Sequence, residues 1–290
     1  MRILLDSQEV CVPEMFDARM IAAAFHQRAA EYDQHVAVQK RVVNNLAKYV
    51  ETHLIEKPFN ILDIGTGTGT LLRNLRCVYP EASLCGIDLA YNMCLRTAAK
   101  LEGDCTVVNG DAENIPFKGG TFDLVVSTSV LQWVGSISNA IHEFRRVLKP
   151  GGTLCIAFFC DGTLGELQNC FRDAACKDGC ESSERTARLH RFWSVDDIKL
   201  ILDAMDFEQV ILNCETEKEW HDDVTSLLRS IKNIGAGAIA GGSGIGLGWR
   251  GIINETSRLY REYYGQDGRI PATYKVLNVY AHAPAFETLK

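Results

Sequence analysis

The chain has 290 residues, of which 47% are hydrophobic and 23% are charged. These proportions are typical of one globular domain with room for insertions, and they exclude disordered, collagen-like and coiled-coil proteins. Acidic residues outnumber basic ones by 37 to 30, for a net charge of −7, so neither a nucleic acid nor an anionic membrane is expected as a partner.

The N-terminal part predicts helices. From Asp17 to Val50, apolar residues recur at helical spacing and no glycine or proline interrupts them, which indicates two helices. We therefore assign residues 1–54 to a helical segment that lies over the ligand site of the following domain. Because Asp6 interrupts the first apolar run, there is no secretory signal, and we expect a cytoplasmic protein.

The middle of the chain alternates strands and helices. Phe59 to Ile64 is a short apolar strand, a glycine turn follows, and Thr70 to Tyr79 has helical character that Pro80 closes. We expect the remaining strands at Ser83–Ile87, Thr106–Val108, Phe122–Ser127, Thr153–Phe158, Phe207–Cys214 and Thr273–His282. This alternation predicts an α/β fold with a doubly wound, mostly parallel, seven-stranded, Rossmann-like sheet.

Two segments exceed what such a sheet needs, and they predict helical cap insertions. Residues 55–220 form the predicted core, with a lid insertion at 161–200; residues 221–270 form a helical cap; and residues 271–290 are the last core strand and a tail. The cap contains the glycine-rich stretch Gly235 to Gly248, whose role stays open between a plain loop and a hinge of the cap.

The cysteines predict no metal site. There are eleven of them, and no two have the C-x-x-C spacing, so we expect scattered, reduced thiols. The closest group, Cys170, Cys176 and Cys180, matches no zinc pattern and is read as thiols of packed helices.

The glycine turn carries the first functional signal. It reads Asp63-Ile64-Gly65-Thr66-Gly67-Thr68-Gly69, whereas a dinucleotide fingerprint needs a further glycine where Thr70 stands. This spacing excludes a nicotinamide oxidoreductase. The pattern resembles motif I of the class I S-adenosylmethionine-dependent methyltransferases, in which Gly65, Thr66 and Gly67 approach the ligand and Asp63 offers a carboxylate to its ammonium group.

Two further acids end the next strands. Asp88, followed by Leu89, can accept hydrogen bonds from ribose hydroxyls, and the resemblance places Asp111 and Ala112 at the adenine edge, with Ser127 ending the fourth strand. Each acid alone is equally well a helix cap or a solvated carboxylate. Three acids at successive strand ends favour a cofactor site.

A closer resemblance extends beyond the shared cofactor motif. The chain is similar to the malonyl-acyl carrier protein O-methyltransferases of biotin synthesis from about Ile21 to Ala281. The segments that carry the likeness are Ile21–Phe25, Arg28–Asp33 with Gln39, Ser129–Trp133, Gly162–Leu167, Arg191-Phe192, Leu228–Ala236 and Pro271–Tyr274. The last two of these segments lie in the cap insertion and at its exit, and they separate this family from generic relatives with the same core.

This resemblance implies a reaction and its cofactor. The methyl group of S-adenosylmethionine is transferred to the free carboxyl of malonyl-acyl carrier protein, or of malonyl-CoA, leaving a methyl ester and S-adenosylhomocysteine. A carboxylate is already ionised at neutral pH and needs no general base. The protein then has to align the acceptor oxygen with the methyl carbon and the sulfur, in a site that excludes water.

The substrate residues follow from the resemblance and from the chemistry of a carboxylate. Arg191 is expected to hold the malonyl carboxylate, and Tyr32 and Tyr274 to donate hydroxyl hydrogen bonds. Gln132 and Trp133 complete the predicted catalytic set, and Gln39 is placed with the cofactor. Each has a structural alternative, such as a buried tyrosine, a helix cap, a core tryptophan or a solvated arginine.

We expect the malonyl group to be carried as a thioester by a carrier protein. Arg185 and Arg188 are expected to contact this protein, because they are basic residues on an otherwise acidic chain. We expect a monomer that binds no nucleic acid, membrane or metal. Two other functions stay open: a methyltransferase acting on another small carboxylic acid or a quinone carbon, and a protein that binds S-adenosylmethionine without turnover.

Overall fold

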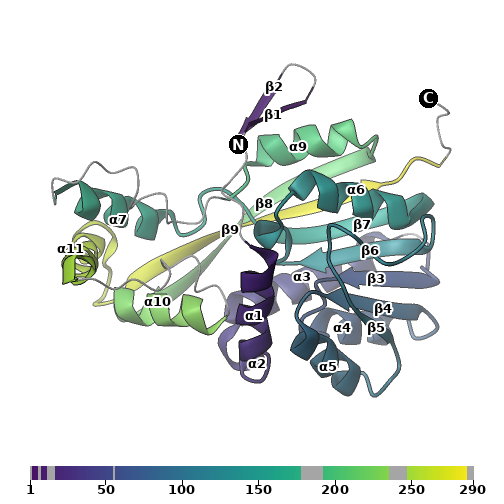
Figure 1. Ribbon diagram of the computed structural model, residues 1–290, viewed down its shortest axis with the longest axis horizontal. Coiled ribbons are helices and arrows are strands. Elements are labelled where there is room, and N and C mark those ends of the chain that lie inside the picture. The colour runs from purple at the N-terminus through teal and green to yellow at the C-terminus, as the bar shows by residue number, and fades with distance from the viewer. Residues whose placement is uncertain are drawn as a thin grey trace.

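The computed structural model describes residues 2–5, 8–11, 17–54, 56–177, 192–234 and 247–285. A seven-stranded sheet crosses the described part of the chain in the order β5-β4-β3-β6-β7-β9-β8 (Figure 1). Its strands are β3 (Asn60–Ile64), β4 (Ser83–Asp88), β5 (Thr106–Asn109), β6 (Phe122–Thr128), β7 (Leu148–Phe159), β8 (Glu208–His221) and β9 (Ile270–His282). Only β9 runs antiparallel to its neighbours β7 and β8, so the predicted doubly wound, mostly parallel sheet is confirmed.

The order of the strands reverses between β3 and β6. From β3 the chain moves outward through β4 to β5, then returns to β6 on the other side of β3. In the parallel register, Ile64 pairs with Ile87 on one side and with Ser127 on the other. The carboxyl ends of these strands therefore open onto the crevice where doubly wound sheets bind ligands.

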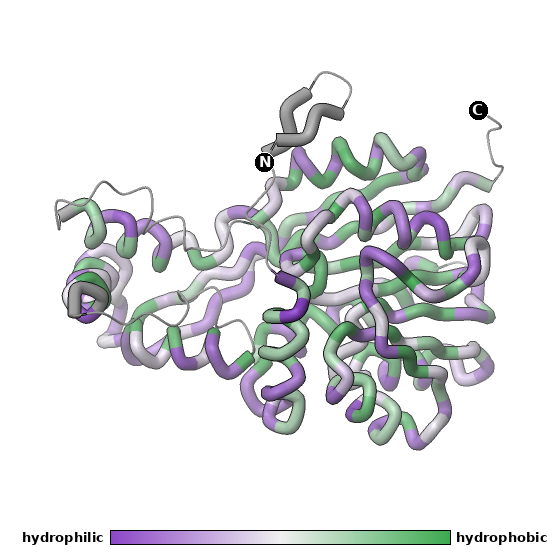
Figure 2. The backbone as a smooth tube through the Cα atoms, in the orientation of Figure 1, coloured by the Kyte–Doolittle hydropathy of each residue, from purple (hydrophilic) through white to green (hydrophobic). Residues whose placement is uncertain are grey.

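Helices cover both faces of the sheet. The helices of the core are α3 (Ala37–His53), α4 (Thr70–Val78), α5 (Tyr91–Lys100), α6 (Ile137–Val147), which follows the 3-10 turn η1 (Leu131–Trp133), and α9 (Val195–Ala204). One buried cluster joins the sheet to α3 and α4, and a second joins it to α6 and α9. Figure 2 shows the resulting pattern, with hydrophobic strands inside and hydrophilic residues along the outer helices.

The N-terminal segment forms three helices instead of the two predicted. They are α1 (Ala18–Arg28), the single turn α2 (Tyr32–His35) and α3. The backbone leaves helical geometry at Val36, with φ −107° and ψ 52°, and this break turns α2 away from the axis of α3. A two-stranded antiparallel sheet of β1 (Arg2–Leu5) and β2 (Gln8–Cys11) precedes them, which we did not predict.

A lobe that we call the cap extends from one end of the sheet (Figure 1, left). It consists of α7 (Gly165–Lys177), α10 (Val224–Asn233), α11 (Leu247–Tyr264) and the outer parts of β8 and β9. The Tyr260 hydroxyl donates to the Pro271 carbonyl oxygen at 2.7 Å, and the Glu166 carboxylate accepts from the Thr273 hydroxyl. These buried contacts fix α7 and α11 to β9.

The strands that carry the cap are longer than predicted. Glu217 pairs with Tyr274, and His221 with Ile270, beyond the strand expected to end at Cys214. α9 also lies partly inside the predicted lid 161–200, yet Ile198 is fully buried in the core cluster with α6. The residues that follow β7 therefore return to the sheet before the predicted end of the lid.

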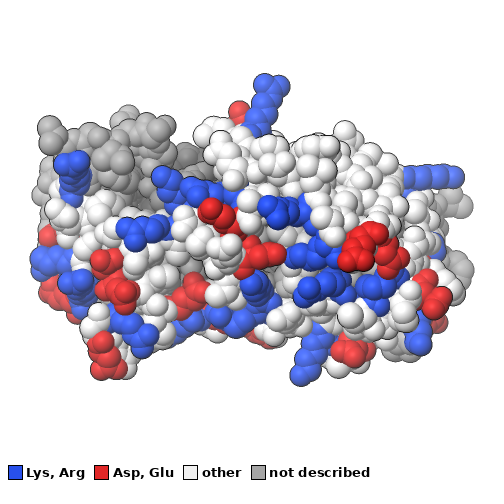
Figure 3. All heavy atoms as spheres, turned by 90° about the horizontal axis from the view of Figure 1, so that it is seen from below, with Lys and Arg blue, Asp and Glu red and all other residues white. Residues whose placement is uncertain are grey.

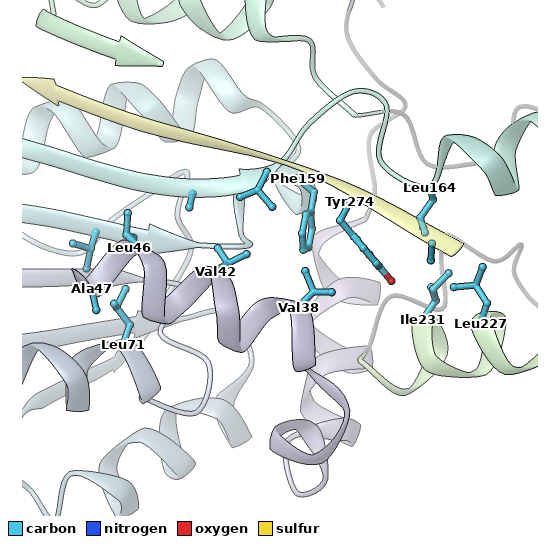
Figure 4. Close-up of a cluster of buried hydrophobic side chains, with 14 of the residues drawn as sticks. Val38, Val42, Leu46, Ala47, Leu71, Phe159, Leu164, Leu227, Ile231 and Tyr274 are labelled. Carbon is cyan, nitrogen blue, oxygen red and sulfur yellow. The ribbon is translucent and has the colours of Figure 1, made fainter. Parts of the chain in front are cut away.

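The core continues without interruption from the sheet into the cap. Figure 4 shows Val38, Val42 and Leu46 of α3 directed towards the sheet, with Phe159 and Tyr274 between them and Ile231 of α10. Because the apolar cluster is shared, α3, the sheet and the cap pack as one body.

Two further findings concern absences. None of the helices in the described ranges combines the length and apolar character that a membrane span requires. Among described side chains, no group of three His, Cys, Asp or Glu residues could hold a metal ion; Cys170 is buried, Cys176 is exposed, and Cys180 lies outside the described residues. Residues 235–246 of the glycine-rich stretch also lie outside them.

Candidate active site

The turn after β3 is possible only with glycine. Gly65, Gly67 and Gly69 all have positive φ values, between 57° and 78°, which side chains rarely tolerate. A Cβ atom on Gly65 would stand 2.0 Å from Cγ2 of Val130. The backbone amides of Gly65 and Thr66 both donate to the Ile87 carbonyl oxygen, at 2.8 and 3.0 Å. The turn is thus held against β4 on one side and the end of β6 on the other.

Asp88 ties the turn to the next helix. One carboxylate oxygen accepts from the Gly67 amide and the other from the Ala90 amide, both at 2.8 Å. Burial raises the pKa of Asp88 to about 6, although both amide bonds favour the charged form. Each oxygen keeps a lone pair that can accept from a ligand hydroxyl.

Asp63 is a buried carboxylate without a donor. It is 1% exposed, and neither of its oxygens has a hydrogen-bond partner, nor has the adjacent Thr66 hydroxyl. Burial raises the pKa of Asp63 to about 7. An unpaired buried charge is costly, and the raised pKa reflects this cost, although the nearby Thr66 hydroxyl lowers the pKa in part. It lies behind the turn and lines none of the cavities described next.

Among the described residues, three cavities lie at this end of the sheet, and the glycine turn lines two of them. The first, of about 790 Å³, follows the ends of β4 and β5 and contains Asp88, Leu89, Asp111 and Ala112. The second, of about 450 Å³, lies between the glycine turn and the start of α3. The third, of about 440 Å³, lies between α1, α2, η1 and the cap.

The three cavities meet at two residues. Tyr32 and Ser129 are the described residues that line all three. Tyr32 comes from α2, and Ser129 follows β6 with a φ of 57° and an amide that donates to the Ala157 carbonyl oxygen at 2.8 Å. Strained backbone of this kind is often found at functional sites. Burial raises the pKa of Tyr32, and the charge of Asp88 adds to the effect.

The third cavity is mostly apolar. Its wall includes Phe25, Trp133, Phe159, Phe192, Ile231 and Ile234, with hydroxyl and amide groups from Tyr32, Gln39, Ser129, Gln132, Thr163 and Tyr274. Among the described residues of this wall there is no carboxyl, imidazole, amine or guanidinium group. Burial and the nearby Glu219 carboxylate also raise the pKa of Tyr274, so both tyrosines stay protonated near neutral pH.

The structure brings most predicted residues to these cavities. Trp133 lies between the first and third cavities, edge-on to Phe25 with ring centroids 5.8 Å apart. Gln132 lines the third cavity and donates from Nε2 to the Ser129 carbonyl oxygen at 3.0 Å, while its Oε1 is buried without a partner. Gln39 lines the second and third cavities.

Some predicted residues are placed elsewhere. Ser127 is buried, and its hydroxyl donates to the Ile64 carbonyl oxygen at 2.7 Å, which joins β6 to β3 instead of facing a cavity. Arg185, Arg188 and Arg191 lie outside the described residues. The residue that follows Arg191, Phe192, is described and lies in the wall of the third cavity.

One polar network at the site was not predicted. Asp33 on α2 accepts from the Thr68 hydroxyl at 2.6 Å and from Lys100 Nζ at 2.9 Å, and Lys100 also bonds to the Thr70 hydroxyl at 3.0 Å. These bonds hold the pKa of Asp33 below its usual value even though burial opposes them. The network holds α2, and with it Tyr32, against the glycine turn. The residues of this network are far apart in the sequence. The one feature that could have indicated it is that Asp33 directly follows Tyr32, a predicted site residue.

Comparison with known proteins agrees with this geometry. Residues 62–156 match the family model described as a methyltransferase domain. A malonyl-[acyl-carrier protein] O-methyltransferase of Geobacter sulfurreducens is 39% identical over 91% of this chain and 98% of its own length. The biotin biosynthesis bifunctional protein BioHC of Teredinibacter turnerae is 29% identical over 93% of this chain and 48% of its own length.

Solved structures share the fold. A candidate methyltransferase from Bacillus halodurans superposes with a TM-score of 0.58 at 19% identity, covering 83% of this chain and 99% of its own. The S-adenosyl-L-methionine complex of a phosphoethanolamine N-methyltransferase from Haemonchus contortus gives 0.50 at 19% identity, covering 83% and 52%. At these identities the likeness concerns the fold alone.

The close approach at Gly65 yields a stability prediction. Gly65→Ala is expected to lower the free energy of unfolding by about 3 kcal/mol, because it adds a clash with Val130 to the strain of a positive φ. Gly103→Ala is the matched control: its φ is +81° but no atom lies within 4 Å, so about 1 kcal/mol is expected. Urea unfolding measures both, and Val130→Ala should restore part of the loss at Gly65. Equal losses at the two glycines would contradict the clash.

The buried Asp63 yields a pH prediction. Its folded pKa of about 7 exceeds the unfolded value of 3.8, so the folded protein binds more protons and loses stability as pH rises between these values. Asp63→Asn removes this term. Its free energy of unfolding relative to the wild type should therefore rise between pH 4 and pH 8, by up to roughly 4 kcal/mol. Parallel stability curves for the two ligand-free proteins would show that the carboxyl is not buried as described.

Proposed function

The chain belongs to the family of malonyl-[acyl-carrier protein] O-methyltransferases, and from that premise we propose that it methylates the free carboxyl group of a malonyl thioester, with S-adenosylmethionine as the methyl donor. The product would be a methyl ester formed early in biotin synthesis, in keeping with the relative named for that pathway. The observation that carries the proposal is the meeting of three cavities at Tyr32 and Ser129.

The three cavities correspond to the three groups on a sulfonium sulfur. The first cavity suits the adenosine, because Asp88 can accept from ribose hydroxyls and Asp111 and Ala112 lie at the next strand end. The second suits the amino-acid end, beside the glycine turn. The third remains for the methyl group and its acceptor.

When bound, S-adenosylmethionine supplies an electrophilic methyl group and a neutral thioether leaving group. The described wall of the acceptor cavity offers no base, which favours an acceptor that is already a nucleophile at neutral pH. A carboxylate meets this requirement, because its ordinary pKa is near 4. A quinone carbon does not, since methylation there must also remove a proton from the ring.

The protein residues then have positioning roles. Tyr32 and Tyr274, both protonated, can donate to the acceptor carboxylate, and Gln132 is fixed by its bond to the Ser129 carbonyl oxygen. Phe25, Trp133 and the other apolar residues of the third cavity exclude water. Because sulfonium and carboxylate charges neutralise each other during the transfer, a cavity of low polarity favours the reaction over the separated ions.

Arg191 is proposed to hold the far oxygen of the malonyl carboxylate. Its neighbour in sequence, Phe192, lines the acceptor cavity, and this cavity has no cation among its described residues. A guanidinium group suits a carboxylate in geometry and charge. A single contact would leave the second oxygen free to attack.

The thioester carrier is proposed to be acyl carrier protein, with coenzyme A as the alternative, and the enzyme to act as a monomer. An anionic carrier must meet local basic groups on a chain whose net charge is −7. Arg185 and Arg188 are the proposed contacts. The face seen in Figure 3 also carries many Lys and Arg side chains, interspersed with acidic ones.

A methyl-transfer assay tests the reaction. With labelled S-adenosylmethionine, malonyl-carrier protein should accept a label that base releases as methanol, whereas succinyl-, acetyl- and unloaded carrier should not. Malonyl-CoA in parallel decides between the two carriers. Transfer to another carboxylic acid would move the assignment to that acceptor, and tight cofactor binding without transfer to any acceptor would indicate a binding protein.

Replacement of the proposed carboxylate holder tests the site. Arg191→Ala should reduce kcat/KM for the malonyl thioester by at least tenfold, because one charged hydrogen bond contributes about 1.5–3 kcal/mol. The Kd for S-adenosylmethionine should not change. Arg172→Ala, at an exposed position on α7, is the matched control and should behave as the wild type. Wild-type kinetics for Arg191→Ala would remove this residue from the site.

A further inference from the structure

Two cysteines outside the proposed site lie in contact with each other. The Sγ atoms of Cys160 and Cys214 are 3.7 Å apart, although 54 positions separate these residues in the sequence. Cys160 directly follows β7 and Cys214 lies on β8, and β9 runs between these two strands in the sheet. The sequence predicted scattered thiols, and this pair arises only because both strands are paired with β9.

The two thiols differ in their access to solvent. Cys160 is 1% exposed and belongs to the apolar cluster that joins the sheet to α6 and α9, whereas Cys214 is exposed. Burial raises the pKa of Cys160 to about 12, and the adjacent Cys214 adds to the effect, so Cys160 stays a thiol near neutral pH. Because a soluble oxidant must reach the sulfur that it modifies, Cys214 is the thiol that reacts first.

Cys160 begins a segment that contributes to the wall of the third cavity. Thr163 and Leu164 line that cavity. The Thr163 amide donates to the Cys160 carbonyl oxygen at 3.2 Å, and the Cys160 amide donates to the Lys275 carbonyl oxygen at 2.9 Å. These three residues of the segment are described, and none of them lines the first or the second cavity. A displacement of Cys160 is therefore expected to change the acceptor cavity and to leave the cofactor cavities intact.

We propose that Cys160 and Cys214 form a reversible disulfide, with a small soluble disulfide such as oxidised glutathione as the oxidant, and that this bond distorts the acceptor cavity. In the first step the Cys214 thiolate attacks one sulfur of the oxidant, so that a mixed disulfide forms and one thiolate leaves. Cys160 then loses its proton and attacks the Cys214 sulfur, and the second thiolate leaves. The two cysteines lose two electrons, the oxidant gains them, and the two cysteine protons end on the two released thiols.

Formation of the bond requires a movement that affects the cavity wall. The sulfur atoms of a disulfide are about 2.05 Å apart, so the two Sγ atoms must approach each other by about 1.6 Å. Cys214 is held within the paired part of β8, opposite Leu277, whereas Cys160 lies past the last residue of β7 that pairs with β9. Cys160 and the segment that follows it therefore move more readily than Cys214. The effect on the malonyl acceptor rests on the proposed function.

The test treats the whole chain with oxidised glutathione and identifies linked cysteines by peptide mapping without reductant. We expect a peptide that joins Cys160 to Cys214, together with a fall of about ten- to hundredfold in kcat/KM for the malonyl thioester, the range for a displacement of about 1 Å in an aligning site. The Kd for S-adenosylmethionine should not change, and dithiothreitol should restore activity. Cys214→Ser should keep its activity after oxidation. Cys77→Ser, which removes another exposed thiol, is the matched control and should be inactivated like the wild type.

Three results would contradict the proposal. A mixed disulfide that persists at Cys214, with no link to Cys160, would exclude the bond. A link that leaves kcat/KM unchanged, or equal inactivation of Cys214→Ser, would exclude its connection with the acceptor cavity. Absence of methyl transfer by the reduced wild type would instead overturn the proposed function, and the two failures are distinguished because peptide mapping detects the bond without any activity.

Discussion

The contact between Gly65 and Val130 is the constraint on which the rest of the site depends. A side chain at residue 65 would occupy the space of Val130, so the turn after β3 and the segment after β6 can approach only through glycine. That approach sets Ser129 beside the turn, where the three cavities meet. Asp88 then fixes the same turn to α5 through the Gly67 and Ala90 amides. The region where the three cavities meet therefore depends on one close contact, between the backbone of Gly65 and the side chain of Val130.

Different parts of the chain supply the two sides of the site. The sheet and its turns supply the acids and the glycine backbone that face the first cavity. The third cavity is lined by residues of α1, α2, α3, η1, β7, α10 and β9, elements that are far apart in sequence. A phosphoethanolamine N-methyltransferase with a similar fold is named for a different acceptor, in keeping with the rule that a fold does not determine the substrate.

The core and the cofactor turn could be predicted because their signals are local. Short apolar strands, alternating helices and the spacing of Gly65 and Gly67 each lie within a few residues, and the seven-stranded sheet followed from them. Ser127 shows the limit of a positional argument: it ends the predicted strand, but its hydroxyl bonds to the Ile64 carbonyl oxygen of the neighbouring strand. The bond between Asp33 and Lys100 joins residues 67 positions apart, and no periodicity reports such a pair. The extension of β8 to His221 likewise depends on pairing with β9, since its exposed, charged residues give no apolar strand pattern.

The cap and the N-terminal helices α1 and α2 lie on two sides of the site, and they are attached to the rest of the protein in different ways. β9 runs unbroken from the sheet into the cap and is paired with β8 along that length. Displacement of the cap would therefore break the backbone hydrogen bonds between these strands and expose the apolar cluster that the cap shares with the sheet. α1 and α2 are held to α5 and the glycine turn by side chains alone: polar bonds at Asp33 and at Asn92, which donates to the His26 carbonyl oxygen, and an apolar cluster that Phe25 and Tyr32 form with Ala90 and Met93. Figure 1 shows these two helices between the cap and the sheet. Moving the N-terminal helices away from the site would therefore break fewer backbone hydrogen bonds than moving the cap, whose position is fixed by the paired strands.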